Sequence, residues 1–372
     1  MATSTLTMLI LVVNAGSTSV KLRLLAEGDR VIRTADLAAL SAEGGVEQLA
    51  DTLAGWPAPD AVGHRIVHGG TEFVGPVVVD SSVRRRIGEF ADLAPLHQPK
   101  SLEAFDAVTR IYPAIPAVAS FDTAFHATIP AAASTYAIPR EWRDRYAVRR
   151  YGFHGLSHEY CSKRAAAMLQ RPVEKLRIVT CHLGGGASAA AIAAGRSVDT
   201  TMGFTPLEGL VMATRSGTVD PGLVLWLQEH EGLSAHDVST ALEHESGLLA
   251  LAGTADMRVV EARAAAGDSA AELALDVYVH RLAAAIASMA VAADGLDVLV
   301  FTGGVGEHSS TVRALATARL AFLGVRIDDG LNRTAVSDAD ITDVRGAIRT
   351  LVVTAREDIQ IASEVRQLIR AI

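Results

Sequence analysis

Residues 14–21 combine the chemical groups that proteins use to hold phosphate. The segment reads Asn-Ala-Gly-Ser-Thr-Ser-Val-Lys, and it offers backbone N–H groups, hydroxyls, an amide and a lysine. Such groups bind phosphate oxygens and a magnesium ion. The segment is not a Walker A loop, because it lacks Gly-Lys-Ser/Thr and a strand follows where that loop needs a helix. Taken alone, it also fits an ordinary turn.

Two later segments repeat this pattern. Residues 182–188 place a histidine, a glycine turn and a serine between two apolar stretches. Residues 298–306 (VLVFTGGVG) lead from an apolar stretch toward a helix near Ser309, which is the geometry of a phosphate-binding helix start. Two glycine-tipped hairpins in two halves of one chain predict two related α/β domains that face each other over one nucleotide.

The elements that position these turns follow from the apolar pattern. Residues 9–13 form an apolar, β-branched run typical of a buried strand, and residues 20–24 alternate apolar and charged side chains. Ser82 and Ser157 are expected to cap helices. We further expect strands at 60–67, 77–80, 117–121, and 350–354, and helices at 82–93, 100–112, 159–169, and 356–370.

Composition limits the functions that the chain can have. Its 372 residues are 49% hydrophobic and 20% charged, which suits a two-domain globular protein. A net charge of −8 disfavours nucleic acid, so local arginines must hold any anionic substrate. Two cysteines are too few for a disulfide framework. The N-terminus lacks the basic segment of a signal peptide, and residues 270–293 carry too many polar side chains for a membrane span. We expect a cytoplasmic protein that binds neither nucleic acid nor membrane.

Ten motifs follow one another along the chain: NAGSTSVK (14–21), GHRIVHGG (63–70), LAPLH (93–97), FDTAFH (121–126), YGFHGLSH (151–158), HLGGGAS (182–188), GFTPLEGLVMATRSGTVDPG (203–222), DMR (256–258), FTGGVGEHS (301–309) and TAREDIQIA (354–362). In these motifs and in their order, the sequence resembles the acetate kinase family of the actin-like, sugar kinase and Hsp70 ATPase superfold. The resemblance implies two duplicated actin-like (ribonuclease H-like) α/β domains with an active-site cleft between them, and a homodimer. One domain would hold residues 1–124 plus 355–372, and the other residues 125–354.

The resemblance implies reversible phosphoryl transfer from ATP to acetate, giving acetyl phosphate and ADP, with Mg²⁺ or Mn²⁺. Catalysis of this kind is mostly positioning and charge stabilisation, for which the planar guanidinium of arginine is well suited. Asp122 alone would fit a turn or cap aspartate equally well. By resemblance, the catalytic residues are Arg65 and Arg215 from opposite domains, His154 as a donor to the transferring phosphoryl group, His97 and His182 as further donors, and Asp122 as an orienting group.

Binding residues are also implied by the resemblance. The metal would be held by Asn14 and Glu357. The methyl group of acetate would lie among Val67, Leu96, Phe153 and Pro206, although composition alone makes these four core residues. The nucleotide would contact Ser17, Ser19, Lys21, His182, Leu183, Gly184, Gly185, Gly186, Asp256, Met257, Arg258, Gly304, Val305, Gly306, Glu307 and His308.

Alternatives remain at this point. A kinase for propionate or butyrate differs only in its pocket, because one methylene is worth about 1–3 kcal/mol of discrimination. A nucleotide-switch protein of the actin or Hsp70 kind would have no need of Arg65, His154 and Arg215. Gly185 and His308 stand where the family has asparagine, which leaves another nucleotide or pyrophosphate open as the phosphoryl donor. Arg356 also replaces an asparagine.

Overall fold

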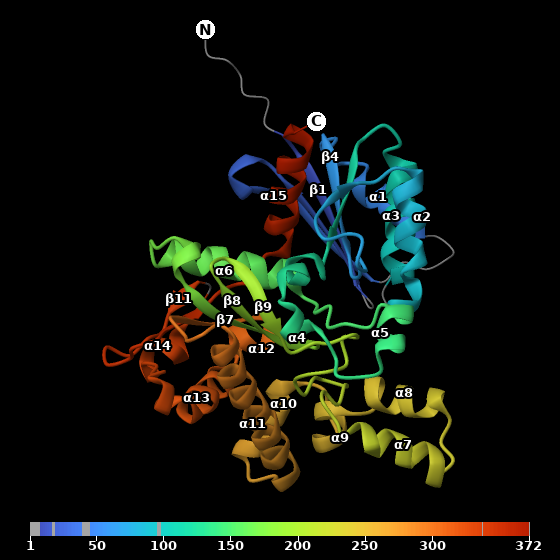
Figure 1. Ribbon diagram of the computed structural model, residues 1–372. Helices are drawn as coiled ribbons and strands as arrows, with labels where there is room; N and C mark the ends of the chain where they lie inside the picture. Colours follow the sequence, from blue (N-terminus) through green and yellow to red (C-terminus); the bar gives the residue numbers. More distant parts are fainter. Residues whose placement is uncertain (1–7, 17–18, 39–44, 95–97, 337, 372) are drawn as a thin grey trace. The chain divides into compact units, whose positions relative to one another are not determined.

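The computed structural model describes residues 8–16, 19–38, 45–94, 98–336 and 338–371, which divide into two compact units (Figure 1). Unit 1 comprises Met1–Ala127, Gly155–Tyr160 and Arg356–Ile372. Unit 2 comprises Thr128–His154 and Cys161–Ala355.

Unit 1 is built on a six-stranded mixed sheet in the order β3-β2-β1-β4-β6-β5. The first three strands form an antiparallel meander, β1, β4 and β6 run parallel, and β5 pairs antiparallel at the edge. The strands are β1 (Ile10–Ala15), β2 (Ser19–Leu25), β3 (Val31–Ala38), β4 (Ala61–Ile66), β5 (Val77–Val78) and β6 (Ala117–Phe121), and the helices are α1 (Gly45–Leu53), α2 (Ser81–Glu89), α3 (Gln98–Ile111) and α15 (Glu357–Arg370).

Unit 2 repeats this sheet strand for strand, in the order β9-β8-β7-β10-β12-β11. A meander again precedes a parallel set, and β11 is the antiparallel edge. The predicted duplication is therefore confirmed. The strands are β7 (Arg177–Leu183), β8 (Ala187–Ala193), β9 (Arg196–Thr200), β10 (Val298–Thr302), β11 (Ala339–Asp340) and β12 (Arg349–Val352). The helices are α4 (Ala131–Ser134), α5 (Arg140–Tyr146), α6 (Gly155–Met168, which begins in unit 1), α7 (Pro221–His230), α8 (Ala235–His244), α9 (Gly247–Ala252), α10 (Met257–Ala265), α11 (Ser269–Ala292), α12 (Gly303–His308), α13 (Ser310–Arg319) and α14 (Asp329–Thr334).

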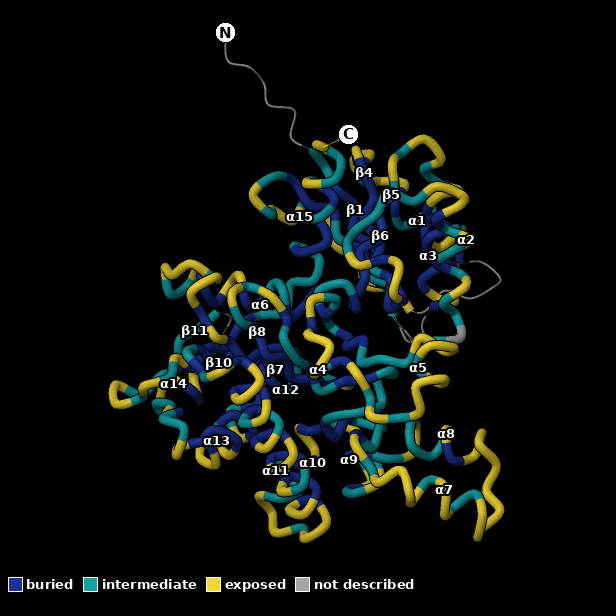
Figure 2. The backbone as a smooth tube through the Cα atoms, viewed as in Figure 1, coloured by how far each residue is buried: buried dark blue, intermediate teal, exposed yellow. Residues whose placement is uncertain are grey.

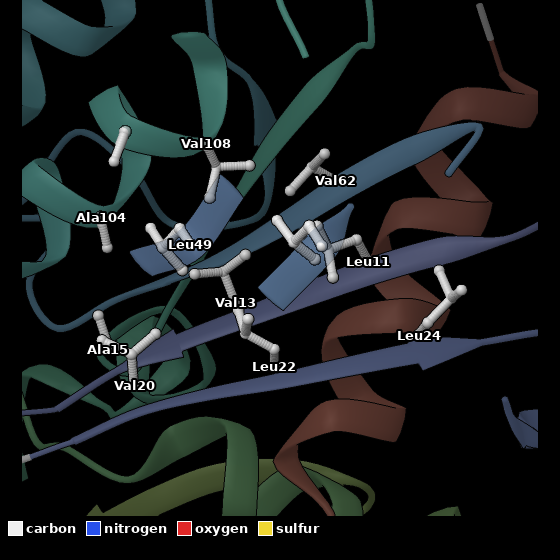
Figure 3. Packing of buried hydrophobic residues seen from close by; sticks show 12 residues of the cluster. Leu11, Val13, Ala15, Val20, Leu22, Leu24, Leu49, Val62, Ala104 and Val108 are labelled. Carbon is white, nitrogen blue, oxygen red and sulfur yellow. The ribbon is translucent and has the colours of Figure 1, made fainter. Parts of the chain in front are cut away.

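Strand β1 is buried on both faces, as its continuous apolar run predicted. Leu11 and Val13 point to the side of α1 and α3, where they pack with Leu49 and Val108 (Figure 3). Ile10 and Val12 point the other way and pack with α15. The two-residue period of a strand accounts for this division, and it fixes β1 in the middle of the unit.

Helix α15 covers the second face of the unit 1 sheet, although it comes from the far end of the sequence (Figure 1). Ile361 and Val365 are fully buried there, which confirms the predicted apolar face. A Cβ on Gly63 of β4 would lie 2.5 Å from Ile361 Cγ2 and 2.8 Å from Val365 Cγ2. Only glycine therefore permits the approach that brings Glu357, at the start of α15, to the sheet.

Helix α11 is the central helix of unit 2. It lies against β7, β8, α9, α10 and α13, and its buried residues recur every three or four positions. Among the described residues it is the one helix long and apolar enough to cross a membrane, and half of its most apolar window is buried in the unit. Both cysteines, Cys161 and Cys181, are buried, and they do not form a disulfide with each other.

Two helix caps differ from the expected ones. Asp80, and not Ser82, caps α2, because its side chain accepts a hydrogen bond from Val83 N. Helix α6 begins at Gly155, so Ser157 lies inside it. The early start comes from tertiary contacts: Gly155 N donates to Asp122 O at 2.9 Å, and Leu156 packs in the core beside α15.

Candidate active site

Four polar side chains converge at the carboxyl ends of the parallel strands of unit 1. Asn14 lies near the end of β1, Arg65 in β4, Asp122 directly after β6, and Glu357 at the first position of α15. Because β1, β4 and β6 are parallel neighbours, their ends meet at one edge of the sheet, where α/β proteins bind ligands. We call these four residues the arginine–carboxylate cluster.

Arg65 is the centre of this cluster. Its Nε lies 3.1 Å from both carboxylate oxygens of Asp122, and its Nη2 lies 2.5 Å from Oδ2. Its Nη1 donates to Asn14 Oδ1 at 3.1 Å, and Asn14 Nδ2 donates to Glu357 Oε2 at 2.8 Å. The guanidinium is thus held in one orientation by charge-assisted hydrogen bonds.

Burial and charge act in opposite directions on this pair. Burial disfavours the charge on Arg65, but the carboxylates of Asp122 and Glu357 outweigh it and raise the pKa of the guanidinium. Burial also raises the pKa of Asp122, and the positive charge of Arg65 opposes that shift. The guanidinium of Arg65 therefore stays protonated at the strand ends.

In unit 2, His154 stands beside the glycine turn between β7 and β8. Its backbone is left-handed (φ 56°, ψ 23°), and it caps the start of α6. Its ring stacks on His182 with centroids 4.4 Å apart, and its Nδ1 lies 2.9 Å from Ser188 Oγ. Both partners belong to the β7–β8 hairpin, so the imidazole is fixed against the turn.

Arg215 reaches the same turn from an irregular segment of unit 2. A Cβ on Gly186 would lie 3.3 Å from the His154 ring and 3.8 Å from Arg215 Nη1. Arg215 Nη1 donates to Pro206 O at 3.3 Å. Burial lowers the pKa of Arg215, while the nearby charge of Glu243 raises it. An imidazole and a guanidinium therefore both lie close to Gly186.

The β10–α12 junction completes this part of unit 2. A Cβ on Gly184 would lie 3.9 Å from Gly304 N, which places the third glycine segment beside the β7–β8 turn. Gly303 has φ +78°, and a Cβ there would collide with the backbone of Leu183. Glu307 accepts hydrogen bonds from Gly303 N at 3.0 Å and Ala355 N at 2.9 Å. Its carboxylate thus supports the turn.

Comparisons with known proteins identify the family of this chain. Residues 34–363 match the Acetokinase family. An acetate kinase of Deinococcus deserti is 43% identical over 98% of both chains.

The chain belongs to the acetokinase family.

Solved structures support the same conclusion and confirm the predicted fold class. The acetate kinase of Porphyromonas gingivalis aligns with a TM-score of 0.90 at 36% identity, covering 97% of this chain and 100% of that one. A propionate kinase from Francisella tularensis aligns with a TM-score of 0.89 at 36% identity, covering 96% and 98%. Membership of the acetokinase family favours an enzyme over the nucleotide-switch protein.

Several residues that the acetokinase resemblance assigned to the nucleotide make contacts within the chain. Asp256 caps α10 and pairs with Arg258, with Nη2 2.6 Å from Oδ2. Met257, which lies between these two residues in the sequence, is buried. Lys21 and His308 are exposed. Near Gly185, a Cβ would meet nothing within 4 Å, so a side chain would fit at this position.

The residues that the resemblance assigned to the methyl pocket belong to both units. Val67 is buried in unit 1, whereas Phe153 and Pro206 belong to unit 2. Arg356 Nη2 lies 2.8 Å from Asp358 Oδ2, whereas Glu357 accepts a hydrogen bond from Asn14. Ser17, Leu96 and His97, which the resemblance also assigned to the site, lie outside the described residues.

Sequence reasoning missed the residues that support the site. Ser188 lies in the HLGGGAS motif, but its contact with His154 was not predicted. Glu208 lies in the motif at residues 203–222, and it accepts hydrogen bonds from Tyr136 and Arg150. A carboxylate inside a glycine-rich, apolar segment was the one available signal.

Proposed function

We propose that this member of the acetokinase family is an acetate kinase, which transfers a phosphoryl group reversibly from ATP to acetate. The observation that carries the proposal is the position of His154 and Arg215 together beside Gly186, in a chain that is 43% identical to an acetate kinase along its length. An acetate oxygen attacks the γ-phosphorus, the bond to the β–γ bridging oxygen breaks, and ADP leaves with that oxygen.

The acceptor needs no general base, because a carboxylate has no proton to lose. Catalysis then requires neutralisation of the charge on the equatorial phosphoryl oxygens. We assign this role to Arg215 and His154, which are fixed by Pro206 O and by Ser188 Oγ respectively. Arg65 would bind the acetate carboxylate or the phosphoryl group from unit 1, with Asp122 orienting its guanidinium. The nucleotide would take the glycine turns of unit 2.

A magnesium ion suits the oxygen donors of unit 1. Among the described residues, no group of three or more His, Cys, Asp or Glu side chains could hold a metal unaided. Mg²⁺ typically takes one or two carboxylates and completes its shell with water and substrate phosphates. Glu357, with Asn14 beside it, supplies such a partial set. When bound, the ion would neutralise charge on the β- and γ-phosphates.

Propionate kinase is the second candidate. The Francisella tularensis propionate kinase aligns almost as well as the Porphyromonas gingivalis acetate kinase, so the backbone does not distinguish the two activities. We propose acetate on the basis of Val67, Phe153 and Pro206, the described members of the predicted methyl pocket. A pocket shaped for a methyl group lowers the rate with longer acids without abolishing it.

The test is hydroxylamine trapping of the acyl phosphate, with acetate, propionate and butyrate compared side by side under ATP, GTP or pyrophosphate. We expect the highest kcat/KM with acetate and ATP, with propionate slower and butyrate slowest. Equal kcat/KM values for acetate and butyrate would contradict the proposed small pocket. A higher rate with pyrophosphate than with ATP would contradict ATP as the phosphoryl donor.

We also propose a cytoplasmic homodimer, as the family resemblance implies. Helix α7 has no buried residue (Figure 2). Leu223, Leu225 and Trp226 are each about half exposed. A group of exposed apolar side chains on one helix is typical of an interface between subunits. Light scattering should give twice the mass of one chain, and Trp226→Glu should shift it toward that of one chain. A wild-type mass of one chain would contradict the dimer.

A further inference from the structure

The segment that carries Pro206 and Arg215 has no helix or strand of its own. Residues 201–220, between β9 and α7, are irregular throughout, so tertiary contacts determine the position of this segment. We propose that Glu208 is a positioning residue, which Tyr136 and Arg150 hold in place and which in turn fixes the segment that aims Arg215. This inference rests on the proposed function of Arg215.

Three side chains from separate parts of unit 2 form a network around Glu208. The Tyr136 hydroxyl donates to Glu208 Oε2, and Arg150 Nη2 donates to Oε1 at 2.8 Å. Arg150 also lies with its guanidinium 5.5 Å above the Tyr136 ring. Each carboxylate oxygen therefore has its own donor, and each donor has a second contact.

These second contacts hold the backbone of the irregular segment. Arg150 Nη1 donates to the carbonyl oxygens of Thr201 at 3.2 Å and Met202 at 3.1 Å. The Tyr136 hydroxyl accepts from Phe204 N at 3.0 Å. Burial raises the pKa of Tyr136, and its hydrogen bond to Glu208 raises it further. The phenol thus stays a donor toward the carboxylate.

The network lies next to both proposed catalytic side chains. Pro206, two residues before Glu208, accepts the hydrogen bond of Arg215 Nη1. Gly203 O accepts from Tyr151 N at 3.0 Å and Gly152 N at 3.3 Å, directly before Phe153 and His154. A Cβ on Gly203 would collide with Glu208 and Tyr136, so the backbone of the segment is in close contact with the network.

Only a carboxylate satisfies both donors at once. In Glu208→Gln the amide oxygen can accept from one donor, while the NH₂ group opposes the other. Tyr136→Phe removes the hydroxyl and leaves the ring under Arg150. We expect each variant to lower kcat by about 10–100-fold, because misplacement of a catalytic group by about 1 Å costs about 100-fold. The KM for ATP should change little.

Asp338→Asn is the matched control. Asp338 is also a carboxylate in unit 2 that accepts from one arginine, Arg164 Nε at 2.5 Å, and from one further donor, Thr354 N at 2.9 Å. This change removes equivalent hydrogen bonds away from the segment 201–220. Its kcat should stay near wild type, while its Tm falls by an amount similar to that of Glu208→Gln.

A double-mutant cycle decides whether Glu208 acts through Arg215. Glu208→Gln should reduce kcat in the wild-type background and have little further effect in Arg215→Ala. Equal fold losses in both backgrounds, or a loss no larger than that of Asp338→Asn, would overturn the positioning role. If wild-type protein forms no acyl phosphate from ATP, the proposed function itself fails, and the two failures are thereby distinguished.

Discussion

Arg65 and Asp122 form a bidentate ion pair across 57 positions of the sequence, with Arg65 Nη2 2.5 Å from Asp122 Oδ2 and Nε 3.1 Å from both carboxylate oxygens. The Asp122 side chain is 1% exposed and that of Arg65 is 15% exposed. A pair this buried restricts the guanidinium to one direction, which a preorganised anion site requires.

Removal of Asp122 should therefore destabilise the protein strongly. Asp122→Ala leaves the buried guanidinium with Glu357, 4.0 Å away, as its remaining counter-ion, and breaking a buried pair from one side costs about 3–5 kcal/mol. Urea unfolding measures this loss. The control is Asp106→Ala, which breaks the more exposed bidentate pair of Arg84 in the same unit and should cost about 1 kcal/mol or less. Equal losses in the two variants would contradict the buried role of Asp122.

Arg215 should matter for rate and not for stability. Arg215→Ala removes a guanidinium beside the glycine turn, and loss of one preorganised donor lowers kcat by about 10²–10³-fold. Arg215→Lys keeps the charge but not the planar pair of donors, so its loss should be smaller. Steady-state kinetics of acetyl phosphate formation will show this order. Wild-type turnover in Arg215→Ala would remove Arg215 from the mechanism.

His154→Asn separates the imidazole from its backbone role. Asparagine tolerates the left-handed conformation of this residue better than most side chains, so α6 should start normally and the Tm should change little. The hydrogen bond that the ring would give to the phosphoryl group is lost, and kcat should fall by about 10²-fold. Ser188→Ala, which leaves the ring in place without its Nδ1 contact, should show a smaller loss. A Ser188→Ala loss as large as that of His154→Asn would mean that the ring serves only to hold the turn.

His64 should make the protein sensitive to acid. It is 2% exposed, burial lowers its pKa to about 3, and neither ring nitrogen has a hydrogen-bond partner among the described residues. The unfolded chain binds a proton at His64 below its ordinary pKa of about 6.5, whereas the folded chain does not, so stability falls as pH decreases through this range. This residue alone should cost about 2 kcal/mol between about pH 8 and about pH 5.

His64→Leu tests this sign directly. The substitution removes the titrating group from an apolar place beside Phe105, so the fall in unfolding free energy on acidification should be smaller than in wild type. His236→Gln, on an exposed position of α8, is the control histidine substitution, and the pH dependence of His64→Leu is compared with it as well as with wild type. An unaltered pH dependence in His64→Leu would show that the pKa of His64 is the same in the folded and the unfolded chain.

Local patterns predicted the strands and their glycine turns well. The strand predicted at residues 117–121 is β6 in the structure. The second glycine hairpin predicted at residues 182–188 corresponds to a sheet topology that is repeated in the two units. These features depend on side chains that are close in sequence, such as the apolar alternation around Val20 and the helical spacing of Ile361 and Val365. Short-range physics determines them, and a single sequence carries that information.

Long-range contacts explain what was missed. Helix α6 starts at Gly155 because its backbone bonds to Asp122 and Leu156 packs beside α15, and neither contact leaves a signal near Ser157. Glu208 meets Tyr136 and Arg150 across 72 and 58 positions. A buried polar network of this kind is formed by the tertiary fold, so periodicity and capping rules could not reveal it.

The most direct test of the central claim is to measure ADP release and acyl phosphate formation together, from ATP and Mg²⁺, with and without acetate. Phosphoryl transfer to a carboxylate predicts one acetyl phosphate for each ADP when acetate is present, very little ADP release without it, and loss of both products together in Arg215→Ala. ADP release at the same rate without acetate, with no trapped acetyl hydroxamate, would contradict an acetate kinase and indicate a plain ATPase.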